Sequence, residues 1–328
     1  MNAHTHLLEL HDVHTYFYTF DGVAKAVDGV SFYLDRGEVL GIVGESGCGK
    51  SVTAQSIMKL IPQPPRKIVQ GEILFDGQNL VNFSLQQMRR IRGNRIAMIF
   101  QEPMTSLNPV YTIGDQIAEM IALHQKVGKR ESWNRAIEML KKVQIPVPEK
   151  RISEYPHQLS GGMRQRAMIA MAMSCNPEIL IADEPTTALD VTVQAQILEL
   201  MLQLREDFEA AIMMITHDLG VIAEMASRVV VMYAGNVVEH AHTIPLFQEP
   251  KHPYTEGLLQ SIPQLGDRSE RGRARLDEIK GTVPSLYNLP AGCRFAPRCK
   301  YRMAICEQQM PELHNLGNDH HVRCWKYE

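Results

Sequence analysis

The feature that most constrains this chain is a glycine-rich loop between an apolar strand and a helix. Residues 44–51 read Gly-Glu-Ser-Gly-Cys-Gly-Lys-Ser, which fits the pattern G-x-x-x-x-G-K-[ST]. The backbone N–H groups of such a loop surround phosphates, its lysine reaches the terminal phosphates, and its serine hydroxyl binds Mg²⁺. Residues 38–43 are nearly all apolar and predict a buried strand, and residues 50–60 have helical length and periodicity. The motif therefore stands in the strand–loop–helix context that a phosphate site requires.

Further apolar segments predict the sheet that carries this loop. Residues 96–100, 179–183, 211–215 and 229–232 are short apolar runs separated by helical stretches. Strands that alternate with helices indicate a parallel α/β sheet. Residues 7–34 mix aromatic and β-branched residues with turns, which predicts antiparallel strands. Residues 113–173 predict a helical subdomain, with helices over 113–124, 132–143 and 163–175.

ATP hydrolysis requires groups that hold the phosphates, a metal ion, and a group that orients the attacking water. Lys50 and the backbone of residues 46–51 would hold the phosphates. Ser51 and Asp183 would hold Mg²⁺ directly or through water, and Glu184, which follows the apolar strand, would act as the general base. An Asp-Glu pair after an apolar strand is by itself an ordinary polar strand end, and the upstream phosphate loop is what gives it a catalytic meaning.

A Ser-Gly-Gly sequence between the phosphate loop and the Asp-Glu strand narrows the choice among the families that carry such a loop. Residues 159–165 read Leu-Ser-Gly-Gly-Met-Arg-Gln, and with the motifs above the chain resembles the nucleotide-binding subunit of an ATP-binding cassette (ABC) transporter. The resemblance implies a P-loop ATPase fold with a parallel core sheet, an antiparallel β subdomain and a helical subdomain. It also implies that Gln101 reaches the metal and the water, and that His217 contacts the γ-phosphate. The nucleotide-binding residues that the motifs and the resemblance together predict are Phe17, Gly44, Ser46, Gly47, Cys48, Gly49, Lys50, Ser51, Val52, Gln101, Asp183, Ser160, Gly161, Gly162 and Asp190.

Two of these predictions depend on the family pattern alone. The family stacks an aromatic side chain of the N-terminal strands on adenine, and of Tyr16, Phe17 and Tyr18 we expect Phe17. In ABC ATPases the Ser-Gly-Gly signature closes over the ATP held by the partner subunit, in a head-to-tail dimer, and Asp190 would lie at that interface. The signature begins a helix, where exposed N–H groups favour an anion.

Longer matches point to one group within the family. The segments at 41–47, 100–109 and 155–163, and the sequence His-Pro-Tyr-Thr at 252–255, are similar to the ATPase subunits of dipeptide, oligopeptide and nickel importers. Met163 resembles the D-type subunit, which implies an F-type ATPase as partner. The resemblance further implies two transmembrane permease subunits, a periplasmic solute-binding protein, and a peripheral location on the cytoplasmic face of a bacterial inner membrane. Dipeptides, oligopeptides, glutathione, nickel complexes, haem and antimicrobial peptides remain open as cargo.

Cysteine placement sets the C-terminal part apart from the ATPase. We expect an ATPase domain over 1–245 and an extension over 246–328, with an exposed charged linker at 264–280. Four of the six cysteines lie in the extension, namely Cys293, Cys299, Cys306 and Cys324. In a cytosolic chain such a cluster indicates a metal site more often than disulfides. The spacing C-x₅-C-x₆-C-x₁₇-C matches neither common zinc nor ferredoxin patterns.

Several group members carry a four-cysteine iron–sulfur cluster in this extension, so we favour [4Fe–4S], with zinc or free thiols as alternatives. Arg294, Arg298, Lys300, Arg302 and Arg323 lie near the cysteines in sequence and would favour thiolates.

Composition and motifs weigh against other classes of protein. A net charge of −3 gives no general attraction to nucleic acid, and the chain has neither a basic leader nor an apolar run long enough to span a membrane. A soluble ABC ATPase acting on DNA or ribosomes would need tandem cassettes or long coiled coils, which are not evident. A redox enzyme would need a flavin or nicotinamide fingerprint, which is also not evident. An exporter subunit stays open.

Overall fold

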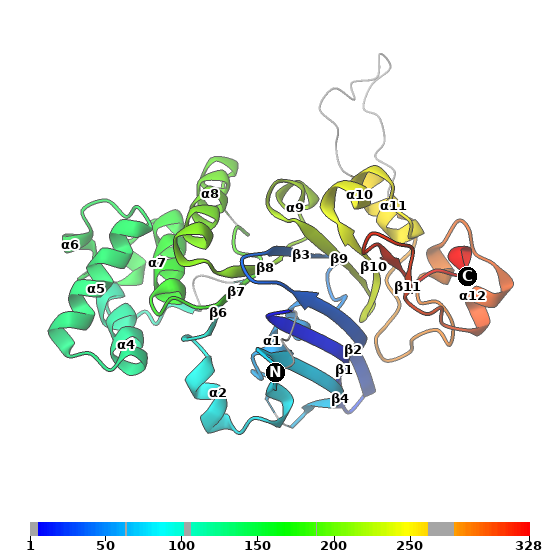
Figure 1. Cartoon of the computed structure of the whole chain (residues 1–328), viewed down its shortest axis with the longest axis horizontal. Coiled ribbons are helices and arrows are strands. Elements are labelled where there is room, and N and C mark those ends of the chain that lie inside the picture. The colour runs from blue at the N-terminus through cyan, green and yellow to red at the C-terminus, as the bar shows by residue number, and fades with distance from the viewer. Residues whose placement is uncertain (1–5, 63, 102–105, 188, 262–278) are drawn as a thin grey trace, which may run out of the picture. The chain divides into compact units, whose positions relative to one another are not determined.

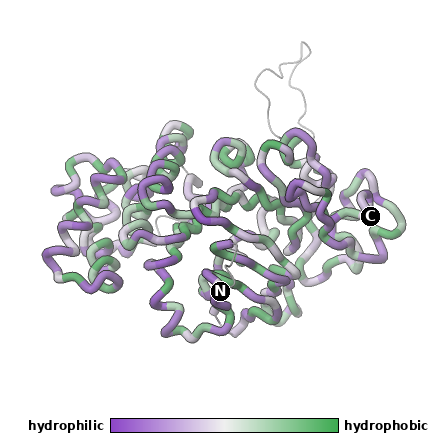
Figure 2. Tube along the Cα trace, viewed as in Figure 1, coloured by the Kyte–Doolittle hydropathy of each residue, from purple (hydrophilic) through white to green (hydrophobic). Residues whose placement is uncertain are grey.

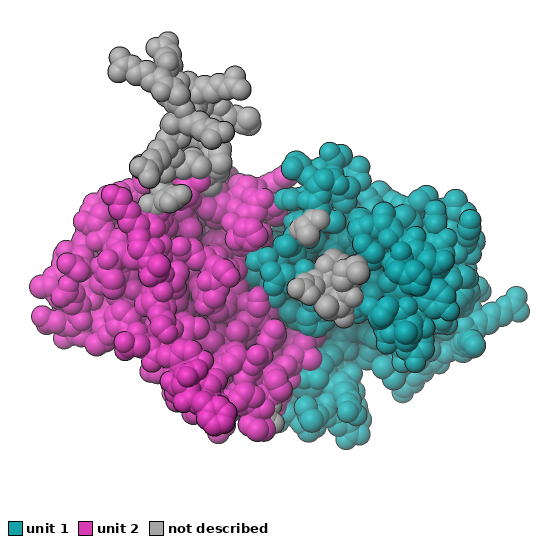
Figure 3. All heavy atoms as spheres, turned by 180° about the vertical axis from the view of Figure 1, so that it is seen from behind, with its two compact units in different colours: residues 1–7, 34–39, 82–215 teal, residues 8–33, 40–81, 216–328 magenta. Residues whose placement is uncertain are grey.

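The computed structural model describes residues 6–62, 64–101, 106–187, 189–261 and 279–328. The chain forms two compact units, which Figure 3 colours separately. Unit 1 comprises residues 1–7, 34–39 and 82–215, and unit 2 comprises residues 8–33, 40–81 and 216–328. The predicted catalytic Glu184 belongs to unit 1, whereas the phosphate loop and the four clustered cysteines belong to unit 2.

Unit 1 contains three parallel strands. They are β6 (Ile96–Ile99), β7 (Ile179–Asp183) and β8 (Ala211–Ile215), with β7 paired to both neighbours. All residues of β7 and β8 are buried and almost all are apolar (Figure 2), as expected for parallel strands covered on both faces. The predictions for 179–183 and 211–215 are confirmed residue for residue.

Helices make up most of the rest of unit 1. They are α2 (Leu85–Ile91), α4 (Ile113–Gln125), α5 (Lys129–Lys142), α6 (Pro148–Arg151), α7 (Gly161–Met173) and α8 (Val191–Phe208), with a 3-10 turn η2 (Pro156–Gln158). Helices α4 and α5 pack on each other and on α7, and α6 packs on α5 (Figure 1). Helix α7 begins at Gly161, two residues before the predicted start, because the Ser160 hydroxyl accepts the Met163 N–H and caps it.

Unit 2 contains an antiparallel sheet built from the N-terminal part of the chain. Its strands are β1 (Leu8–Thr19), β2 (Gly22–Leu34), β4 (Arg66–Phe75) and β5 (Gln78–Asn79), in the order β2-β1-β4-β5. The antiparallel prediction for residues 7–34 is confirmed. Strand β4, which pairs with β1 along most of its length, was not predicted.

The phosphate loop joins β3 (Val39–Val43) to α1 (Lys50–Ile57) in unit 2. Strand β3 pairs in parallel with β9 (Arg228–Tyr233), which forms an antiparallel pair with β10 (Asn236–His242). The other helices of the unit are η1 (Leu80–Asn82), at its boundary, α9 (Leu219–Met225), α10 (Thr243–Gln248), α11 (Pro253–Gln260), η3 (Ala296–Arg298), α12 (Ala304–Gln308) and η4 (Trp325–Tyr327). The predicted strand–loop–helix order is therefore present.

The C-terminal extension is continuous with this sheet. Strand β12 (His321–Val322) pairs with β10 and with β11 (His314–Asn315), all in antiparallel fashion. Most of the predicted linker, residues 264–278, lies outside the described residues. Among the helices of the described part of the chain, none has both the length and the apolar character needed to cross a bilayer.

Candidate functional site

The phosphate loop has a backbone that only glycine fits at two positions. Gly49, which precedes α1, has φ of 106°, and a Cβ there would lie 2.3 Å from the Ala26 carbonyl oxygen. Gly44 has φ of 149°, and its Cβ would lie 2.2 Å from the Met232 carbonyl oxygen. Glycine at these two positions therefore lets strands β2 and β9 approach the loop closely, as a loop that wraps phosphates requires.

Lys50 and Cys48 lie within this loop in different roles. The Lys50 ammonium group is buried and donates to the carbonyl oxygens of Gly44 (2.6 Å) and Glu45 (3.2 Å). It therefore lies against the loop that is expected to bind the phosphates. Cys48 is fully buried, and burial raises the pKa of its thiol. Its side chain is a packing element beneath the loop.

Other predicted nucleotide residues of unit 2 have these positions. Ser51 and Val52 lie in the first turn of α1 and are half-buried, and His217 is exposed immediately before Asp218, which caps α9. Tyr16 donates to the Asp28 carboxylate at 2.5 Å, and burial together with this bond raises the pKa of its hydroxyl. Phe17 carries the Arg66 guanidinium 4.4 Å above its ring. Tyr16 is thus held by Asp28, and the expectation that Phe17 stacks on adenine stays a prediction.

Unit 1 brings together two of the predicted catalytic side chains. Gln101, which follows β6, donates its amide N–H to Glu184 Oε2 at 2.9 Å, and Thr187 donates its hydroxyl to the same oxygen at 3.0 Å. Glu184 follows β7 with a left-handed φ of 49°, which turns the chain directly after the buried Asp183. Thr187 was not predicted, although a hydroxyl three residues beyond the base is visible in the sequence.

The signature residues and Asp190 lie close together in unit 1. Ser160 caps α7, and Asp190 caps α8 by accepting the Val193 N–H at 2.9 Å. A Cβ on Gly162 would lie 2.9 Å from a Val193 methyl, so the start of α7 packs tightly on the start of α8. Ser160, Gly161 and Asp190 are exposed. This surface presents the N-terminus of a helix to whatever approaches it.

Comparison with known proteins identifies the family. Residues 27–187 match the ABC transporter family model, and residues 238–306 match the oligopeptide/dipeptide transporter C-terminal region. A probable peptide ABC transporter ATP-binding protein of Sinorhizobium fredii is 54% identical over 320 residues, which cover 98% of this chain and 95% of the relative. The chain belongs to the ABC transporter family.

Two relatives from Bacillus subtilis are ATP-binding proteins of peptide transporters. The oligopeptide transport ATP-binding protein OppD is 52% identical over 98% of this chain and 89% of its own length. The dipeptide transport ATP-binding protein DppD is 50% identical over 97% and 94%. Among solved structures, the dimeric ATP-binding cassette MJ0796 in a post-hydrolysis state bound to ADP and Pi has a TM-score of 0.65 and 28% identity, over 72% of this chain and 98% of that chain. The ABC ATPase fold predicted from the motifs is confirmed.

The four cysteines of the extension line one pocket of this ABC protein, with a volume of about 360 Å³. Cys293 donates its N–H to the Cys306 carbonyl at 2.8 Å, which joins the first and third cysteines through the backbone. Burial raises the pKa of the Cys293 thiol to about 11, and it also raises the pKa of Cys299 and of Cys324. Apolar and aromatic neighbours, among them Phe295 and Trp325, complete the lining. The predicted grouping of the four thiols is therefore present.

The cations near the cysteines serve other groups. We expected them to favour thiolates, but the structure pairs Arg294 with Asp28, Arg298 with Glu45, Lys300 with Glu256 and Arg302 with Glu307, and directs Arg323 to the carbonyls of Val237 and Pro311. The expectation fails because sequence proximity does not fix the direction of a long side chain. Burial raises the pKa of Cys293, Cys299 and Cys324 by more than the nearby cations lower it.

A second group of ligand-type side chains lies where β10 meets β12. Within the described part of the chain, His240, Asp319 and His321 are the one trio whose ligand atoms lie within 4.8 Å of one another. Asp319 Oδ2 accepts the Tyr33 hydroxyl at 2.7 Å and faces the buried Arg228 at 3.3 Å. Burial lowers the pKa of His240 to about 4. Because Arg228 already neutralises the carboxylate, we assign this group an ion-pair role in holding the extension, and no metal.

Proposed function

We propose that this chain is the ATP-hydrolysing subunit of a bacterial importer of dipeptides or oligopeptides. The observation that carries the proposal is the Glu184 carboxylate, which is held by Gln101 and Thr187 directly after the buried Asp183. Two bonds to one carboxylate oxygen fix the orientation of a general base. The peptide cargo is supported by the extension and by the oligopeptide and dipeptide transport for which the relatives are named. Nickel, haem, glutathione and antimicrobial peptides are the alternatives.

Each predicted residue has a role in this proposal. Lys50 and the N–H groups of residues 46–51 bind the phosphates, Phe17 stacks on adenine, and His217 contacts the γ-phosphate. Ser51, Asp183 and Gln101 would hold Mg²⁺, and their oxygen donors are of the kind that this ion prefers. Mg²⁺ neutralises phosphate charge as it develops. The Lys50 ammonium would exchange its bonds to Gly44 and Glu45 for bonds to phosphate oxygens.

The exposed signature supports a dimeric enzyme. Ser160, Gly161 and Asp190 are exposed at the starts of α7 and α8, where a partner's nucleotide could approach. We infer a head-to-tail dimer with a second ABC ATPase of the F type. Two permease subunits and a periplasmic solute-binding protein complete the importer. This chain would lie on the cytoplasmic face of the inner membrane. Within the chain, the boundary between the ATPase domain and the extension lies near residue 245.

We further propose that the four-cysteine pocket holds an iron–sulfur cluster. The donor set fits, because four thiols line one pocket of about 360 Å³. Their spacing disfavours a single zinc ion: thiolates on tetrahedral zinc lie about 3.8 Å apart, given Zn–S bonds of about 2.3 Å. No three of these four described cysteines bring their sulfur atoms within 4.8 Å of one another. A cluster places its own atoms between the thiolates and suits the wider spacing. It would fix the fold of the extension.

Replacing the base tests the proposed function. Glu184→Gln keeps the shape of the side chain, and its amide oxygen can still accept the bonds from Gln101 and Thr187. We expect ATP binding to persist and turnover by the assembled transporter to fall by about 10²- to 10⁴-fold. Glu206→Gln, which alters an exposed carboxylate on α8, is the matched control and should retain turnover. Wild-type turnover in the Glu184→Gln complex would refute the assignment.

A further inference from the structure

The phosphate loop is held from outside by two side chains of the C-terminal extension. Glu45, the second residue of the loop, donates its backbone N–H to the Tyr254 hydroxyl at 2.8 Å. Its carboxylate accepts two parallel bonds from Arg298, at 2.7 Å to Oε2 and 3.0 Å to Oε1. The Arg298 side chain is only 4% exposed. Bidentate arginine–carboxylate pairs fix orientation as well as distance, so the extension constrains both the backbone and the side chain of Glu45.

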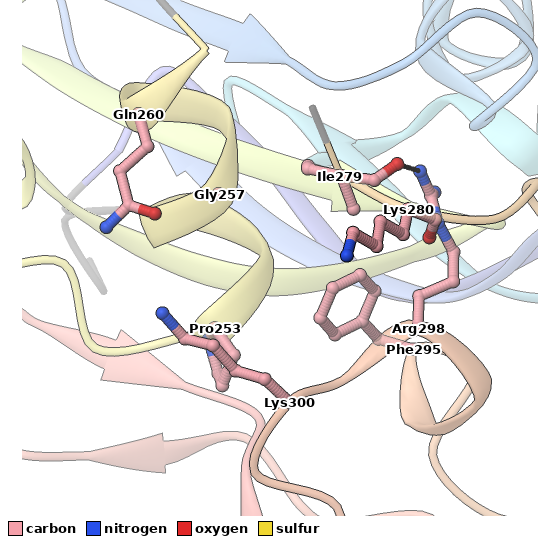
Figure 4. A pocket seen from close by; sticks show the side chains of 8 residues that line it. All are labelled: Pro253, Gly257, Gln260, Ile279, Lys280, Phe295, Arg298 and Lys300. Atoms are coloured by element: carbon pink, nitrogen blue, oxygen red, sulfur yellow. Dashed lines mark hydrogen bonds between the residues drawn. The ribbon is translucent and has the colours of Figure 1, made fainter. Parts of the chain in front are cut away.

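Arg298 is itself held in one orientation. Its remaining N–H groups donate to the carbonyls of Ile279 (3.0 Å) and Lys280 (3.1 Å) and to the Tyr233 hydroxyl (3.3 Å). All five donors of the guanidinium are thus used. Figure 4 shows the guanidinium directed at the Ile279 backbone, with the Phe295 ring beside it. The hydrogen bond to Glu45 is the largest of the causes that raise the pKa of the Arg298 guanidinium.

A set of packed aromatic rings supports the two contacts. Tyr254 is fully buried, with its ring centroid 4.6 Å from that of Tyr233 and 5.4 Å from that of Phe295. Tyr233 and Phe295 meet edge to face at 5.3 Å. Rings packed in this way have few alternative positions. A displacement of Phe295 would therefore reach Tyr254 and, through its hydroxyl, Glu45.

The segment that carries Arg298 begins and ends at a clustered cysteine. Between Cys293 and Cys299 the chain forms η3, with bonds from the Ala296 N–H to the Cys293 carbonyl (3.0 Å) and from the Cys299 N–H to the Ala296 carbonyl (3.3 Å). Phe295 lines the cysteine pocket and also the adjacent pocket of about 330 Å³ that contains Arg298 (Figure 4). Whatever binds the thiols of Cys293 and Cys299 fixes both ends of this segment.

We propose that Arg298 is a positioning residue for the phosphate loop, and that a metal group bound by the four cysteines sets the affinity for ATP by ordering residues 293–299. The inference rests on the proposed function, in that the loop is taken to bind ATP. In this arrangement the extension is a regulatory element of the ATPase. Without a group on the four thiols, η3 would be free to move and Arg298 would release Glu45, so the loop would lose the shape that surrounds the phosphates.

The first test measures the affinity of the purified full chain for trinitrophenyl-ATP with Mg²⁺. Arg298→Gln and Glu45→Gln break the same contact from its two sides, so each should raise the Kd about five- to twentyfold, and the double variant should raise it no further. Arg298→Lys keeps the charge and should recover part of the affinity. Arg302→Gln, at an exposed ion pair of the same extension, is the matched control and should bind like wild type.

The second test removes the metal group. Anaerobically purified wild-type chain should bind the nucleotide more tightly than the same chain after chelation, by the same factor that Arg298→Gln costs. Chelation should leave the Kd of Arg298→Gln unchanged, which a merely structural role for Arg298 would not produce. Wild-type affinity in Arg298→Gln, or equal affinities before and after chelation of wild type, would overturn the inference. Failure of the wild-type chain to bind the nucleotide at all would instead overturn the proposed function.

Discussion

Substitution of Gly49 by alanine tests whether the phosphate loop depends on the close approach of two backbones. The added Cβ would lie 2.3 Å from the Ala26 carbonyl oxygen, at a φ of 106°. Gly47→Ala is the matched control, because Gly47 has a φ of 78° and a Cβ there would meet no atom within 4 Å. Both variants incur the strain of a left-handed residue, about 1–2 kcal/mol. Only Gly49→Ala must also displace a backbone carbonyl.

The difference between the two variants measures that displacement. A contact of 2.3 Å has to open to at least 3.0 Å, so the backbone must shift by 3.0 − 2.3 = 0.7 Å. Such overpacking costs about 1–3 kcal/mol. We therefore expect Gly49→Ala to lower the free energy of unfolding by about 2–5 kcal/mol and Gly47→Ala by about 1–2 kcal/mol, measured by urea unfolding of the nucleotide-free chain followed by circular dichroism. Equal destabilisation of the two variants would refute the reasoning.

Three further predictions concern assembly, the cysteines and pH. Because the signature is useful only across an interface, the purified subunit should hydrolyse ATP slowly, with a specific activity that rises with protein concentration; a rate independent of dilution and equal to that of the full transporter would contradict the dimer. Protein purified without oxygen should show the visible absorbance of iron–thiolate charge transfer, which Cys306→Ser should abolish and Cys175→Ser should retain. Colourless protein with one zinc per chain would instead show that the cysteines bind zinc and not an iron–sulfur cluster. Burial lowers the pKa of His252 to about 4, so the unfolded chain, with a pKa of about 6.5, binds more protons between these values. The free energy of unfolding should therefore fall as pH drops from about 6.5 to 4, and His252 contributes a slope of about 1.4 kcal/mol per pH unit. Asn in place of His252 can still cap α11, so His252→Asn should flatten the slope. An unchanged slope in this variant would show that His252 is not the titrating group.

The strands of unit 1 could be predicted from sequence for a physical reason. Residues 179–183 and 211–215 form strands buried on both faces, which leave a continuous apolar run. Strand β4 was missed because only half of its ten residues are apolar and Gly71 separates them into two short runs. Gly71 has a φ of 94° and lies against the Asp12 backbone, where the register with β1 shifts. A bulge of this kind removes the alternation on which strand prediction depends.

The candidate site likewise contains residues that the sequence predicted correctly and one contact that it did not predict. Glu184 and Gln101 follow predicted strands, and the structure joins them by a hydrogen bond. Arg298 was assigned to the neighbouring cysteines, yet it binds Glu45, 253 positions away in sequence. Local sequence indicates which residues are able to act. It does not indicate which distant partner a flexible arginine side chain reaches, since that depends on how the extension packs against the phosphate loop.

Uptake of a labelled oligopeptide by proteoliposomes is the most direct test of the central claim. The vesicles would contain this chain, its partner ATPase and the two permeases, with ATP on the side of the ATPases and a loaded solute-binding protein on the other. We predict ATP-dependent accumulation of the peptide, its loss with Glu184→Gln, and its retention with Glu206→Gln. Accumulation that continues at the wild-type rate with Glu184→Gln, or ATP hydrolysis that no peptide cargo stimulates, would contradict the account.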